Sequence, residues 1–362
     1  MSPSYRDLLS LAWPIVISRA SQVVVGVCDA WMVASLGTVA LAAVTTGAMN
    51  VFTVLILPMG VTFIVSSFSS QLCGKGDLAG ARRYGWYGLL LAAVTLVLCA
   101  LAYPLVEPIV GLMPYEPAVA ESLSVYIRIR LLSGGAAIGM EALANYYGGL
   151  GNTRLPMFAN VAAMVLNVVG NWILIGGHLG APAMGVAGAA WASVIATTLA
   201  FAGLLVFFLR DTGTVKAGAL RMSEFVRMLR FGLPSGLNWF IEFLAFMFFV
   251  NIVVAGLGTT SLAGMMAVMQ INSVSFMPAF AMASAGAILV GQSIGKGDKD
   301  GVGRIVRMTF TVTGSYQGLV GLMYLLLPGI LFAPFVTDNA DGAQLLSVGT
   351  KLLMLSAAWQ AL

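Results

Sequence analysis

The chain has 362 residues, of which 59% are hydrophobic and only 9% are charged. A soluble domain carries roughly 25% charged residues, so this composition excludes an ordinary soluble protein and indicates a membrane protein. The net charge of +4 does not predict a nucleic-acid partner, because the basic residues lie between apolar stretches, where they set topology. Cys28, Cys73 and Cys99 follow no pairing or metal-binding pattern, so we expect neither a disulfide nor a metal site.

Apolar stretches long enough to cross a bilayer recur along the chain, separated by short polar connections. Since backbone polar groups find no water in lipid, we predict that each stretch is a helix. The first stretch lacks a small-residue cleavage site, so we expect a retained helix rather than a signal peptide. The predicted segments are 8–35, 40–72, 84–108, 118–150, 155–177, 183–209, 231–257, 261–294, 306–336 and one that starts near 342.

The sequence contains an internal duplication. Residues 71–77 (QLCGKGD) return as residues 292–298 (QSIGKGD), and the same displacement relates Leu36 to Leu257. A repeat of this period indicates two copies of one structural unit. Each copy has an even number of predicted spans, so both copies have the same orientation and are related by an axis along the membrane normal.

The duplication also predicts the domain organisation. We expect a six-helix N-terminal lobe at 1–210, a cytoplasmic linker at 211–230, and a C-terminal lobe at 231–362 that holds about four of six helices. The fold class is therefore an all-α polytopic membrane protein with two parallel six-helix repeats. We expect a twelve-helix fold that is truncated in helix ten in this chain. A cytoplasmic N-terminus places most Lys and Arg on the inner side, as the positive-inside rule requires.

Three acids lie inside the predicted spans and away from their ends: Asp29, Glu141 and Glu242. A carboxylate in a membrane is costly, so each is a candidate functional group. Burial favours the protonated form, which suits a proton carrier, whereas a carboxylate among hydroxyl and amide oxygens suits sodium. The alternative for each acid is a structural hydrogen bond between helices. We favour that structural role for Glu141, near the inner end of its segment.

Other polar residues share helix faces with each other or mark a bend. Gln22 precedes Asp29 by seven residues, which places both on one face of a helix. Asn167 and Asn171 are four residues apart and also share a face, where amides either bind an ion or connect helices. Pro14 removes a helix hydrogen bond, so it marks either a hinge or a static bend.

An ordered set of short motifs runs through the chain. The set is Ala12-Trp13-Pro14, Asp29, Leu36-Gly37, Leu41-Ala42-Ala43, Pro58, residues 74–77, residues 149–153 ahead of Pro156, Gly232-Leu233-Pro234, Glu242 and Gly291-Gln292. With these motifs the whole chain resembles the multidrug and toxic compound extrusion (MATE) family. It departs at Gly148 and Asn152, where the family often has Arg and Asp, and both positions fall at a predicted cytoplasmic loop.

The resemblance implies a cation-coupled drug exporter with two six-helix lobes that face a central cavity. It implies that Asp29 is a coupling aspartate and that Gln22 lines the drug cavity. It also implies that Asn167 and Asn171 present amides to Asp29, with Ser193 as a further oxygen.

Glu242 stands apart because it has no acidic counterpart in the first copy, where the matching position is Ser21. In the family, a glutamate here marks the branch that is often coupled to sodium. We therefore place Glu242 with Asp29 in the ion-coupling set and, with Gln22, in the substrate cavity.

Our hypothesis is an Na⁺- or H⁺-coupled antiporter, not an enzyme, that exports amphipathic and mostly cationic drugs by alternating access. We expect no cofactor or metal besides the coupling ion, and a monomer that crosses the inner or plasma membrane many times. One alternative is a lipid-linked oligosaccharide flippase, for which Arg19 offers a cation to pyrophosphate. Another is a non-transporting membrane scaffold or receptor.

Overall fold

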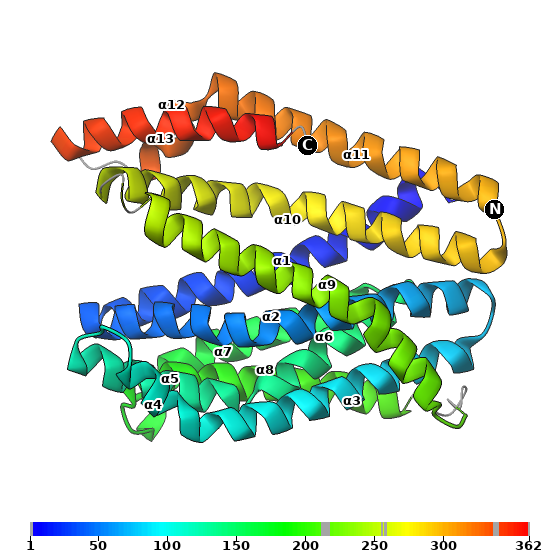
Figure 1. The fold of residues 1–362 in the computed structure, drawn as a ribbon, viewed down its shortest axis with the longest axis horizontal. Helices are drawn as coiled ribbons and strands as arrows, with labels where there is room; N and C mark the ends of the chain where they lie inside the picture. The colour runs from blue at the N-terminus through cyan, green and yellow to red at the C-terminus, as the bar shows by residue number, and fades with distance from the viewer. Residues whose placement is uncertain (1–2, 211–217, 255, 257–258, 336–339, 361–362) are drawn as a thin grey trace. The chain divides into compact units, whose positions relative to one another are not determined.

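The computed structural model describes residues 3–210, 218–254, 256, 259–335 and 340–360. These residues form helices joined by short turns, and no strand occurs among them, which confirms the predicted all-α class (Figure 1). A π-helical stretch, Phe249–Val254, continues α9. The α-helices are α1 (Tyr5–Ala34), α2 (Thr38–Gly74), α3 (Leu78–Ala102), α4 (Val106–Gly111), α5 (Pro117–Leu131), α6 (Gly134–Gly149), α7 (Arg154–Gly176), α8 (Gly185–Arg210), α9 (Met222–Phe248), α10 (Thr259–Lys296), α11 (Lys299–Leu326), α12 (Pro328–Phe332) and α13 (Ala340–Trp359).

Within the described ranges, 7 helices are long and apolar enough to cross a membrane, and the bent pair formed by α11 and Pro328–Phe335 raises this to 8. Predicted segment 118–150 is not one helix, because α5 ends at Leu131 and α6 begins at Gly134. Gly134 and Gly135 directly after Ser133 disfavour a continuous helix at this point. The last predicted segment holds a shorter apolar helix, Gln344–Ala358.

The helix boundaries confirm the duplication. α2 begins at Thr38 and α10 at Thr259, and α3 begins at Leu78 and α11 at Lys299, so both pairs are 221 positions apart. The turns that follow α2 and α10 also match, since both contain a glycine in the left-handed region, Gly76 with φ 79° and Gly297 with φ 76°. A residue with a side chain is strained there, which explains the repeated glycine.

The chain divides into two compact units, which we call the first unit (residues 1–16, 241–290 and 299–362) and the second unit (residues 17–240 and 291–298). These boundaries differ from the predicted lobes, so the division at 210 and 231 stays a prediction. Residues 211–217 of the predicted linker lie outside the described residues. α1, α9 and α10 each contribute to both units, and α1 passes from one to the other at residues 16 and 17.

The second unit is a bundle in which α2, α3, α5, α6, α7 and α8 pack side by side (Figure 1). Glycines allow the close approach: a side chain at Gly85 would meet the ring of Phe208, and one at Gly88 would meet Ala142. Membrane helices associate mainly by such packing of small residues, because lipid already surrounds their apolar surface.

Both copies of the repeated motif meet inside the second unit. A Cβ on Gly74 would collide with the backbone of Gln292, and a Cβ on Gly295 would collide with the backbone of Gln71. Gly74 and Gly295, like Gln71 and Gln292, are equivalent positions of the two copies. The contact is therefore reciprocal, as expected around an axis that relates the two copies.

The first unit has its own apolar core. Leu8 and Ala12 of α1 pack with Met282 of α10 and Ile305 of α11. A second cluster joins α10, α11, α12 and α13 around Phe332, which is fully buried. Pro14 lies inside α1 near the end of the part that belongs to this unit.

Candidate functional site

Asp29 lies in a buried polar cluster that joins α1, α7 and α8. Asn171 Nδ2 donates a hydrogen bond to Asp29 Oδ1 at 2.5 Å, and Ser193 Oγ lies 3.5 Å from Asp29 Oδ2. Asn167 Nδ2 donates to Ser193 Oγ at 3.0 Å, and Asn171 Nδ2 also lies 3.2 Å from Asn167 Oδ1. All four side chains are buried, and Asp29 is 8% exposed. The structure thus brings together four of the five residues of the predicted ion-coupling set, all except Glu242.

Helix geometry and small residues position this cluster. Asn167 and Asn171 are one helical turn apart on α7, so their amides point the same way. α7 lies close to α8, because a Cβ on Gly188 would lie 2.5 Å from the carbonyl oxygen of Leu174, and one on Gly170 would lie 3.1 Å from the Cβ of Ala192. This close packing brings Ser193 within reach of the α7 amides.

One atom of the cluster has no partner among the described residues. Asn171 Oδ1 is buried and accepts no hydrogen bond. A buried carbonyl oxygen without a donor costs about 1–3 kcal/mol, so this oxygen is a candidate acceptor for a donor or a candidate ligand for a cation.

Arg130 of α5 is a neighbour that sequence reasoning did not place here. Its guanidinium interacts electrostatically with Asp29 and with the hydroxyl of Tyr126, one helical turn away on α5. Arg130 Nε is itself buried without a partner in the described part of the chain. The only sequence signal for it is an arginine in an otherwise apolar run, which by itself names no partner.

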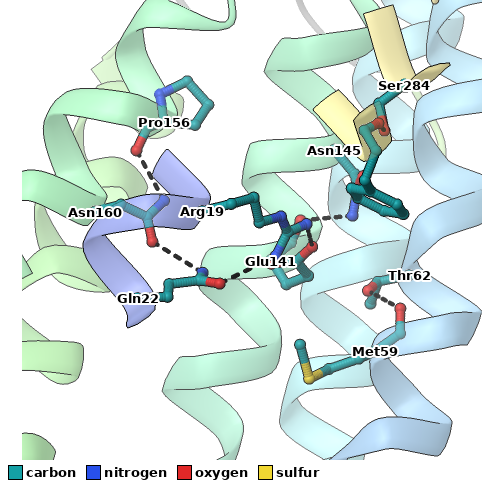
Figure 2. A network of polar contacts seen from close by, with 10 residues as sticks. Arg19, Gln22, Met59, Thr62, Glu141, Asn145, Pro156, Asn160 and Ser284 are labelled. Carbon is teal, nitrogen blue, oxygen red and sulfur yellow. Dashed lines mark hydrogen bonds and ion pairs between the residues drawn. The ribbon is translucent and has the colours of Figure 1, made fainter. Parts of the chain in front are cut away.

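A second polar network, drawn in Figure 2, lies further toward the N-terminus of α1. Arg19 Nη2 forms an ion pair with Glu141 Oε1 of α6 at 2.8 Å, and Arg19 Nη1 donates to Gln22 Oε1 at 3.2 Å. Gln22 Nε2 donates to Asn160 Oδ1 of α7 at 3.2 Å (Figure 2). Gln22 therefore joins the Arg19 network and not the Asp29 cluster, although both residues belong to α1. Its place in a substrate cavity stays a prediction.

Glu242 belongs to neither network. It lies on α9 in the first unit, it is exposed, and it has no hydrogen bond or ion pair with the residues that the structure describes. The Asp29 cluster belongs to the second unit. The predicted roles of Glu242 in coupling and in the substrate cavity stay predictions, as does the hinge at Pro14.

Comparison with known proteins identifies the family to which the chain belongs. A family model described as MatE matches residues 14–173 and 234–360. The probable multidrug resistance protein NorM of Chromobacterium violaceum is 30% identical over 98% of this chain and 77% of its own length. The multidrug resistance protein PmpM of Pseudomonas aeruginosa is 26% identical over 98% of this chain and 75% of its own length.

Solved structures show the same fold. A crystal structure of MATE in complex with MaL6 superposes with a TM-score of 0.87 at 20% identity and covers 100% of this chain and 82% of its own. An outward-facing multidrug resistance MATE family transporter of the MOP superfamily superposes with a TM-score of 0.83 at 21% identity, over 100% of this chain and 83% of its own. The two stretches that match the family model fall in the two copies of the duplication, and this multi-pass membrane protein belongs to the MatE family.

Proposed function

We propose that this chain is a multidrug efflux transporter that moves amphipathic, mostly cationic compounds out of the cytoplasm in exchange for H⁺ or Na⁺. The names of its relatives, a probable multidrug resistance protein and a multidrug resistance protein, support drug export. The proposed setting is the cell membrane, with a cytoplasmic N-terminus and a monomeric protein. The inward ion gradient would supply the free energy for export.

The observation that carries this proposal is the carboxylate of Asp29, which is held between three helices by neutral donors. Asn171 and Ser193 stabilise the charged form of Asp29 without neutralising it. A proton or a cation that binds to Asp29 neutralises its charge and so weakens these hydrogen bonds. Asn171 Oδ1 has no partner among the described residues and can accept a hydrogen bond or bind a cation. Asp29 is thus poised to gain and lose one charge.

The change in charge would bias the conformation of the protein. Asp29 connects α1 to α7 and α8, so its neutralisation weakens a contact between helices. A ligand shifts an equilibrium only if it binds the two conformations with different affinity, and the coupling ion meets that condition when only one conformation keeps the Asp29 contacts. Alternation between inward-open and outward-open forms follows from this difference.

The flippase alternative loses support from the second network. It needs a cationic surface for pyrophosphate, whereas the Arg19 guanidinium lies 2.8 Å from the Glu141 carboxylate, whose negative charge repels an anionic substrate. Drug export needs no such surface and is favoured by acids inside apolar helices, which attract organic cations.

The test uses the purified chain in proteoliposomes, with ethidium efflux measured under an imposed proton gradient and, separately, a sodium gradient. We expect export with at least one gradient and its loss in Asp29→Asn, which keeps the shape of the side chain and removes the charge. Glu116→Gln is the matched control, because Glu116 is exposed at the start of α5 and makes no side-chain cap. Gradient-driven efflux that is equal in Asp29→Asn and the control would remove Asp29 from the coupling mechanism.

A further inference from the structure

The ion pair between Arg19 and Glu141 is only partly buried. Arg19 Nη2 bonds Oε1 of the Glu141 carboxylate at 2.8 Å. The two side chains keep 19% and 12% of their surface exposed, so the pair is not sealed inside the bundle. The backbone carbonyl of Glu141 is occupied separately, by Asn145 Nδ2 at 2.9 Å (Figure 2).

Arg19 has a second hydrogen-bond acceptor, which does not depend on Glu141. Gln22 Oε1 accepts from Arg19 Nη1 at 3.2 Å, and Gln22 is fixed in turn by Asn160 of α7 at 3.2 Å. Asn160 is anchored to the carbonyl of Pro156 at 3.0 Å (Figure 2). The guanidinium can therefore leave Glu141 and still keep a hydrogen bond to an oriented amide.

The chemistry of the pair matches that of an occupied cation site. A guanidinium on a carboxylate makes the same charge-assisted hydrogen bond that the protonated amine or amidine of an organic cation would make. A buried carboxylate without a partner is costly, so an internal cation keeps the site stable while no external cation is bound. The exchange of one cation for another costs less than the filling of an empty charged pocket.

We propose that Glu141 is a binding carboxylate for organic cations and that Arg19 is its displaceable internal counter-ion. In the resting site Arg19 forms an ion pair with the Glu141 carboxylate. An incoming organic cation binds to the carboxylate and displaces Arg19, which keeps its hydrogen bond to Gln22. The physiological meaning of this site rests on the proposed export function, whereas the binding itself does not. Arg19 then sets specificity, because only a cation that competes with a guanidinium can bind.

The experiment measures equilibrium binding of ethidium, a permanent cation, to the purified full chain in detergent without any gradient. Arg19→Gln frees Glu141, so it should bind ethidium more tightly than the wild type does. The double variant Arg19→Gln/Glu141→Gln removes both charges together and leaves none stranded. We expect Arg19→Gln to bind ethidium with a Kd about tenfold lower than that of the double variant, an effect near the lower end of those measured for close charge pairs.

The pair of Arg128 and Glu107 provides the matched control. It is also an ion pair, at 2.6 Å, but its side chains are 29% and 69% exposed. Its neutralisation by Arg128→Gln/Glu107→Gln should leave the Kd for ethidium within about twofold of the wild-type value, since exposed pairs contribute little.

Equal Kd values for Arg19→Gln and the double variant would overturn the proposal, because the freed carboxylate would then attract no cation. If Arg19→Gln does not give a monodisperse protein, Arg19→Lys replaces it: lysine keeps the charge but lacks the planar fork of arginine, so it should be displaced more easily and lower the Kd. An unchanged or raised Kd in Arg19→Lys overturns the proposal equally.

The same measurements separate this inference from the export function. If the wild type exports ethidium but the variants bind it equally, only the role of Glu141 fails. If the wild type shows no gradient-driven export, the export function fails, and the comparison of Arg19→Gln with the double variant still decides whether Glu141 binds cations.

Discussion

Two carboxylates of the second unit have opposite surroundings, although both lie in apolar helices. Asp29 is 8% exposed and receives its hydrogen bonds from an amide and a hydroxyl, which are neutral. Glu141 is held by the guanidinium of Arg19, 122 residues away in the sequence. A carboxylate whose hydrogen-bond donors are neutral can change its charge without breaking an ion pair, although the Arg130 guanidinium also acts on Asp29 electrostatically. A carboxylate in an ion pair cannot, so Asp29 suits ion coupling and Glu141 suits exchange of one cation for another.

The largest expected effect concerns the free energy of unfolding. Its absence would contradict the distinction between Asp29 and Glu141. Glu141→Gln leaves the Arg19 charge without its partner, so we expect a destabilisation of about 3 kcal/mol. Asp29→Asn should cost only about 1 kcal/mol, because Asn171 can still donate to the new amide oxygen. Unfolding of both purified variants with denaturant in detergent checks the order. Equal destabilisation would mean that Asp29 also depends on a charged partner, with Arg130 as the candidate.

A second test concerns the close packing that supports the Asp29 cluster. Gly188→Ala would place a Cβ 2.5 Å from the carbonyl oxygen of Leu174, so we expect α7 and α8 to separate at a cost of about 1–3 kcal/mol. Gly203→Ala on the same helix is the control. No atom lies within 4 Å of its Cβ, and alanine favours the helix. Thermal unfolding midpoints should fall for the first variant and hold or rise for the second.

A third test sharpens the roles inside the cluster. Asn171→Ala removes the direct donor to Asp29, whereas Asn167→Ala removes the donor to Ser193 and the second acceptor of Asn171 Nδ2. A hydrogen bond to a charged group contributes about 1.5–3 kcal/mol, against about 1 kcal/mol between neutral groups. Gradient-driven ethidium efflux should therefore fall further in Asn171→Ala. The reverse order would show that Ser193, and not Asn171, holds the carboxylate.

The smallest expected effect belongs to the exposed ion pair of Arg128 and Glu107. Its neutralisation should change the free energy of unfolding by less than about 1 kcal/mol, because water screens the pair. A larger loss, measured by the same unfolding assay, would mean that exposure does not separate this pair from that of Arg19 and Glu141.

The sequence predicted those features that depend on local spacing. The repeat of residues 71–77 predicted matching helices, and α2 and α10 do begin at equivalent positions. The spacing of Asn167 and Asn171 predicted a shared face, and the family resemblance placed that face toward Asp29, where the structure has it. The roles of these residues in coupling stay proposals.

Features that depend on long-range packing were not predictable in the same way. The partner of Glu141 is Arg19, and no local pattern connects two residues on different helices. The break between α5 and α6 falls inside predicted segment 118–150, and its glycines do not reveal it, because glycine also occurs inside membrane helices. Arg130 is close enough to act on Asp29 electrostatically because α5 packs in the same bundle, and no spacing in the sequence predicts this.

The most direct measurement compares how strongly ethidium binds to the wild type and to Asp29→Asn as the proton and sodium concentrations are varied. By thermodynamic linkage, an ion that weakens or strengthens substrate binding changes the Kd of the substrate. The Kd of the wild type should change with at least one of the two ions, and that change should disappear in Asp29→Asn. The same ion dependence in both proteins would contradict a coupling role for the Asp29 carboxylate.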